Sequence, residues 1–116
     1  IIGGVMEIQK LKEYIKAAEN ISDMLYANDV SGAQKFIGET VNNVNNIYLG
    51  YINRADELRN RGIDIPVDIL LSQMKNLMTA IDSKDIIMLA DTLLYEIKEG
   101  MLFFTDIENE LGGTQE

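Results

Sequence analysis

The sequence predicts an all-α fold, arranged as an antiparallel up-down-up-down four-helix bundle in a single domain over residues 1–116. Apolar side chains recur at every third or fourth position along almost the whole chain, and this is the period of an amphipathic helix. Short stretches of turn-forming residues break the period at three places, and short connections place consecutive helices side by side in opposite directions. No alternating run of apolar and polar residues lies between turn signals, so the sequence predicts no strand.

The first two helices are predicted over residues 5–27 and 32–61. The segment between them contains Ser31 and Gln34, which fit a capping box, in which each side chain bonds the free backbone N–H of the other residue. Gly62 lies where a left-handed residue would end the second helix. The apolar stripe of the first helix is Leu11, Tyr14, Ile15, Ala18, Ile21 and Leu25, and that of the second is Ala33, Ile37, Val41, Val44, Tyr48, Tyr51, Ala55 and Leu58.

The third and fourth helices are predicted over residues 66–82 and 84–111, and the tail 112–116 is expected to fray. Asp64 and Ser83 are the candidate N-caps of these helices. The proline that opens the third helix is tolerated in a first turn. The stripe of the third helix is Val67, Leu70, Met74, Leu77 and Ile81. The core line of the fourth is Ile86, Ala90, Leu93, Ile97, Phe104 and Leu111, flanked by Ile87, Leu94, Met101 and Phe103.

The main core is predicted to be built around Leu93 and Ile97 of the fourth helix. Their expected neighbours are Val44, Tyr48, Leu70 and Leu77. A shift of 56 residues also superposes the apolar positions of the two halves, for example Leu11 on Val67. Any two amphipathic hairpins of similar length align in this way, so the halves are either two duplicated αα-hairpins or two unrelated ones.

The composition excludes several kinds of site. The chain has no cysteine and no histidine, which removes disulfides, thiolate nucleophiles and the commonest general base and transition-metal ligand. The net charge is −9, and residues 85–116 carry eight acidic side chains against one basic side chain. Such a field repels phosphate backbones and anionic membrane surfaces, so neither nucleic acid nor membrane is an expected partner. We expect a cytoplasmic protein, because the lack of cysteine fits a reducing compartment and the first residues lack the pattern of a signal peptide.

One acidic motif could carry metal chemistry. Glu96 and Glu99 form an E-x-x-E pair, and this pair resembles half of the magnesium site of all-helical nucleotide pyrophosphohydrolases, which use two such pairs on facing helices. The second pair is missing from this sequence. We therefore expect no catalytic, cofactor-binding or metal-binding residues. A carboxylate-only, metal-dependent enzyme similar to those pyrophosphohydrolases is the alternative function.

The fourth helix also carries a resemblance. Its segment "LADTLLYEI", Leu89 to Ile97, resembles a group of uncharacterised short acidic helical proteins of Gram-positive bacteria of the Firmicutes type. These proteins end in a leucine-rich helix with an Ala-Asp, a pair of leucines and a Tyr-Glu. The resemblance implies a helical fold and implies no activity.

A stripe on the fourth helix predicts an interface. Met88, Tyr95 and Leu102 recur every seven positions on the face opposite the core, among charged residues. An apolar stripe rimmed by charge suggests a binding surface, whereas single exposed apolar residues need no explanation. We expect this face to bind a protein partner or a second copy, with a symmetric homodimer favoured because two-fold homodimers are the commonest oligomers. The predicted function is therefore a non-enzymatic protein–protein interaction module, such as an adaptor, a chaperone-like protein or a regulator.

Overall fold

The computed structural model describes the chain from residue 2 to residue 113, with side chains from residue 7 to residue 112. Over this range the protein is all-helical and has no strand, which confirms the predicted class. The elements are α1 (Ile2–Tyr26), α2 (Val30–Asn53), α3 (Ala55–Asn60), α4 (Val67–Ser83), α5 (Ile86–Asp91), the π-helix η1 (Thr92–Ile97) and α6 (Lys98–Gly113). Helix α6 continues to Gly113, so the predicted fraying is wrong for the first two residues of the tail, and residues 114–116 lie outside the described residues.

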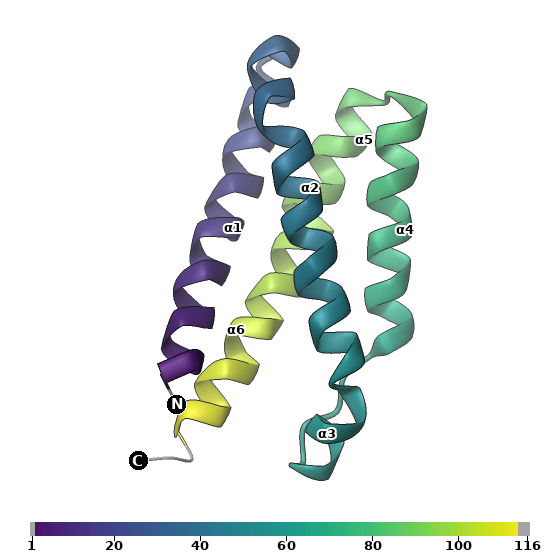
Figure 1. Ribbon diagram of the computed structural model, residues 1–116. Helices are drawn as coiled ribbons and strands as arrows, with labels where there is room; N and C mark the ends of the chain where they lie inside the picture. The colour runs from purple at the N-terminus through teal and green to yellow at the C-terminus, as the bar shows by residue number, and fades with distance from the viewer. Residues whose placement is uncertain (1, 114–116) are drawn as a thin grey trace.

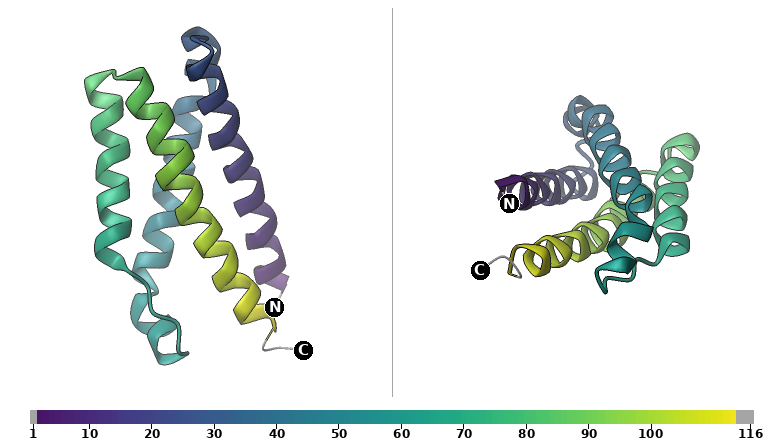
Figure 2. Two further views of the ribbon diagram at one scale, coloured as in Figure 1. Left: turned by 180° about the vertical axis from the view of Figure 1, so that it is seen from behind. Right: turned by 60° about the horizontal axis from the view of Figure 1, so that its bottom comes forward.

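The helices are arranged around one long composite helix. The elements α5, η1 and α6 follow one another without a break, and Figure 1 shows that together they cross the molecule obliquely, from the side of α4 to the side of α1. Helix α4 packs mainly against α5 and η1, whereas α1 accompanies the composite helix through α5, η1 and α6. The views in Figure 2 agree with this arrangement. None of the helices between residues 2 and 113 is long and apolar enough to cross a bilayer.

The core contains the residues that the apolar period predicts. Leu93 and Ile97 are buried, at 1% and 0% exposed, and their four predicted neighbours are at most 2% exposed. The ring of Phe104 lies between two tyrosines of α2. It stacks on Tyr51 with 4.2 Å between ring centroids and meets the edge of Tyr48 at 5.1 Å. Such aromatic pairs add to the stability that burial of apolar area provides.

The predicted N-caps of α2 and α5 are wrong. Helix α2 begins at Val30 rather than residue 32, because the carboxylate of Asp29 accepts the backbone N–H of Gly32 at 3.0 Å. Ser31 therefore lies inside the first turn and does not cap. At α5 the cap is Asp85, which accepts the N–H of Met88 at 3.0 Å, while Ser83 is the last residue of α4. In both cases an aspartate next to a left-handed residue takes the place expected for a serine.

The connection between α2 and α4 differs from its prediction in part. Gly62 has φ of +83°, so the predicted left-handed position is confirmed. The second predicted helix is nevertheless interrupted at Arg54, which ends α2 and precedes the short helix α3. Asp64 does not cap α4. The residue before α4 is Pro66, which makes no side-chain capping bond.

Candidate interaction surface

The composite helix contains a π-helical segment that keeps its buried face in register with the core. Buried residues follow one another at intervals of four, at Leu89, Leu93, Ile97 and Met101. In an α-helix of 3.6 residues per turn, each such interval would move the side chain by about 40° around the axis. In η1 the turn is wider, and the N–H of Lys98 donates to the carbonyl of Leu93, five residues earlier. The wider turn offsets part of this drift, and all four side chains remain buried.

A serine from α1 binds the composite helix where its hydrogen-bond pattern changes. Ser22 is fully buried, and its hydroxyl donates to the carbonyl oxygen of Ala90 at 3.1 Å. Ala90 lies two residues before η1. A change from α-helical to π-helical bonding disturbs the partners of the carbonyls at the junction, and a buried carbonyl needs a donor. Ser22 supplies one and so links α1 to this junction.

The predicted interface residues lie in two different environments. Tyr95 is 66% exposed and Leu102 is 38% exposed, so both are on the surface. Met88 is half-buried and packs against the hydrophobic core. Ile87, which was predicted to flank the core, is instead 54% exposed. The π-helical segment η1 explains why Ile87 rather than Met88 is exposed, because a π turn holds one residue more than an α turn. Residues before η1 are therefore displaced by one position, and Ile87 occupies the outward place that a regular helix would give to Met88.

A tyrosine from α1 extends this surface. Tyr26 is 42% exposed, and its hydroxyl donates a hydrogen bond to the carboxylate of Asp91. This bond is the main reason that the pKa of Tyr26 is raised to about 12, and the neighbouring Tyr95 contributes to the same shift. The exposed residues Tyr26, Ile87, Tyr95 and Leu102 are called the outer surface below. In Figure 2, left, the composite helix that carries three of them lies in front, with no other helix over it.

The rim of the outer surface is acidic. Lys98 is the one basic residue among residues 85–116. It forms an ion pair with Glu19 of α1, with 2.8 Å between Nζ and Oε2. The hydrogen bond to Glu19 is also the main cause that raises the pKa of Lys98. Solvent screens an ion pair that is this exposed, so it stabilises the fold little, but it does neutralise the cation. The exposed Glu99 and Asp106 form no ion pair with a lysine or arginine of the described residues.

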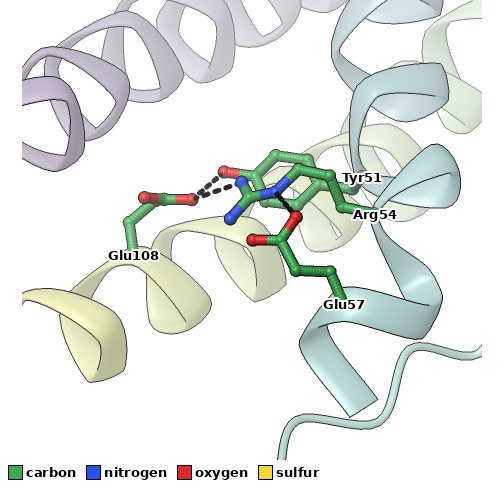
Figure 3. A network of polar contacts seen from close by, with 4 residues as sticks. All are labelled: Tyr51, Arg54, Glu57 and Glu108. Carbon is green, nitrogen blue, oxygen red and sulfur yellow. Dashed lines mark hydrogen bonds and ion pairs between the residues drawn. The ribbon is translucent and has the colours of Figure 1, made fainter. Parts of the chain in front are cut away.

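A second polar cluster lies at the other end of the molecule, between α2 and α6. Figure 3 shows Tyr51 and Arg54 directed at Glu108 of α6. Glu108 is only 4% exposed, and its Oε2 accepts the Tyr51 hydroxyl at 2.6 Å. Arg54 Nη1 lies 3.8 Å from the same oxygen, and Arg54 Nε lies 3.7 Å from Glu57. A buried carboxylate needs such partners, so this cluster joins α2 to α6 and has the character of a structural contact.

The acidic pair considered for metal binding is divided between two environments. Glu96 accepts a hydrogen bond from Asn76 of α4, with 2.9 Å between Nδ2 and Oε1, whereas Glu99 is exposed. Within the described residues, no group of three or more Asp, Glu, His or Cys side chains is placed to hold a metal ion. Glu96 therefore belongs to the contact between α4 and η1, whereas Glu99 faces solvent.

Alkaline pH is expected to destabilise the protein through its buried tyrosines. Burial is the main cause that raises the pKa of Tyr48 and Tyr51 above the ordinary 10.0, and the pKa of Tyr26 is also raised. The folded state therefore keeps these protons when the unfolded chain would lose them. The stability that they contribute is complete below about pH 10 and is lost as pH rises through the folded-state pKa values.

Thermal melts at increasing pH would measure this effect. The melting temperature should fall above about pH 10, and tyrosinate absorbance should develop together with the loss of helical circular dichroism. The chain has five tyrosines and no tryptophan, which makes this absorbance easy to assign. Complete ionisation of all five tyrosines in a protein that keeps its helices would contradict the prediction.

Comparison with known proteins identifies no relative. No protein-family model matches the chain, and no curated protein and no solved structure matches it.

Proposed function

We propose that this protein is a non-enzymatic protein–protein interaction module, built as an antiparallel four-helix bundle, and that it binds a second copy of itself through the outer surface. The observation that supports the proposal is the exposure of Tyr95, Ile87 and Leu102 on one helix, beside Tyr26 of α1. Clustered apolar and aromatic side chains rimmed by charge are typical of protein interfaces. Adaptor, chaperone-like and regulatory roles in the cytoplasm are all compatible with such a module.

The spacing of the residues supports a second copy as the partner. In a two-fold interface, a residue i contacts j of the partner while j contacts i. Leu102 lies seven residues after Tyr95, and Ile87, which the π turn places outward, lies eight residues before it. When two composite helices pair in opposite directions with Tyr95 near the two-fold axis, Leu102 of each copy faces Ile87 of the other. The outer surface is thus complementary to itself.

The charges make the proposed dimer sensitive to salt. In the same arrangement Asp91 faces Glu99 of the other copy, since these residues lie four positions before and after Tyr95. Like charges repel across an exposed interface, and salt screens this repulsion over a Debye length of about 8–10 Å. The dimer is therefore expected to become tighter as salt is added, whereas binding of a basic partner would become weaker.

Light scattering after size exclusion tests the proposal. Wild-type protein should run as a dimer, and Leu102→Lys should run as a monomer that keeps the helical circular dichroism of wild type, because residue 102 is partly exposed. Ile69→Lys is the matched control, since Ile69 is 57% exposed but belongs to α4. It should remain a dimer. A wild-type monomer at high protein and salt concentration would rule out the homodimer.

A further inference from the structure

A pocket that is lined by none of the residues of the outer surface lies near the α1–α2 and α4–α5 connections. It has a volume of about 500 Å³, and its walls include the apolar side chains of Leu25, Ile37, Ile81, Ile86 and Leu89. These residues come from four helices. Pockets that hold small molecules in proteins are mostly apolar and have volumes of roughly 300–1,000 Å³. The size and lining therefore suit an aliphatic ligand.

Polar groups lie among the lining residues of the pocket. Lys84 lines it and has a left-handed backbone with φ of +56°, which non-glycine residues seldom adopt. No ion pair of Lys84 is present in the described part of the chain. The carboxylate of Asp85 also lines the pocket, but it caps α5 by accepting the N–H of Met88, and Gln34 provides an amide. A cation without an acidic partner is thus available for the head group of a ligand.

We propose that this pocket binds a medium-chain aliphatic carboxylate, whose chain lies among the apolar side chains and whose carboxylate binds Lys84. The carboxylate is chosen by charge complementarity, because an ammonium donates strong hydrogen bonds to a carboxylate and none to a hydrocarbon. The site involves none of the residues of the outer surface. It is therefore a second property of the protein, and the dimer could fail while this site is real.

Gly38 allows the pocket to be filled without damage to the fold. It lines the pocket, it lies in the interior of α2, and a Cβ added there meets no atom within 4 Å. Gly38→Leu should place an aliphatic side chain where the ligand would lie, and it should raise the melting temperature because leucine favours helix more than glycine does. Gly50→Leu is the matched control, because Gly50 also lies in α2 with open space at its Cβ but does not line this pocket.

Calorimetric titration with dodecanoate below its micelle concentration tests the proposal. Wild type and Gly50→Leu should bind one equivalent with the same affinity, and Gly38→Leu should not bind. Lys84→Glu should bind about tenfold more weakly, since it replaces the cation with a like charge, and dodecanol should bind wild type more weakly than dodecanoate does. Failure of wild type to bind, or equal binding by Gly38→Leu, would overturn the site. Equal affinity for dodecanol and dodecanoate would overturn the role of Lys84.

Discussion

Leu93→Ala should lower the free energy of unfolding by about 2–5 kcal/mol, the range that large-to-small core substitutions cover. Leu93 is 1% exposed and lies in η1, which packs against α1, α4 and α6. Its carbonyl accepts the five-residue hydrogen bond that defines the π turn. The walls of the resulting cavity belong to several helices, and they cannot close over it without moving this turn. We therefore expect a value in the upper half of the range.

Urea denaturation followed by circular dichroism would measure the loss. Leu71→Ala is the matched control, because Leu71 is 46% exposed on α4, and surface substitutions usually change stability by at most about 0.5 kcal/mol. The slope of the unfolding free energy against urea should be the same in both variants if only stability changes. A loss below about 0.5 kcal/mol for Leu93→Ala would place this side chain outside the core.

The sequence predicts those parts of the fold that depend on local periodicity. Apolar spacing identifies the buried faces, and Leu93, Ile97 and Tyr48 are buried as that spacing implies. It cannot identify η1, because intervals of four residues also occur in α-helices, and only packing against α1 and α4 makes the wider turn favourable. Because the spacing does not reveal η1, it predicts Met88 on the exposed face, where the structure has Ile87.

The contacts between distant residues were beyond sequence reasoning. Tyr26 and Asp91 are separated by 65 positions, and Tyr51 and Glu108 by 57. No spacing rule links residues so far apart, since their approach depends on how the helices pack. One signal could have been used: each of these tyrosines lies on or beside a buried stripe, and a tyrosine in a core usually finds a partner for its hydroxyl. The sequence could predict that a partner exists, but only the packing shows which residue it is.

Gly100→Ala should lower the free energy of unfolding by about 2–4 kcal/mol, although alanine is the better helix former. Gly100 is buried in α6 directly against Tyr48. A Cβ at this position would overlap the Tyr48 hydroxyl oxygen, and it would lie 2.8 Å from Tyr48 Cζ and 2.9 Å from Gln73 Oε1. Tyr48 is fully buried and donates to Gln73 at 2.7 Å. The ring therefore has no free space to enter, and the added methyl group breaks this hydrogen bond or separates α6 from α2.

Two further variants distinguish this overlap from an effect of helix propensity. Gly38→Ala has open space at its Cβ, so it should raise stability by about 0.5–1 kcal/mol, the usual gain for alanine over glycine in a helix. Tyr48→Phe removes the overlapping oxygen, so the double variant with Gly100→Ala should be more stable than the sum of the two single losses implies, with a coupling of about 1 kcal/mol or more. If Gly100→Ala instead stabilises the protein as Gly38→Ala does, then α6 does not approach Tyr48 as closely as described.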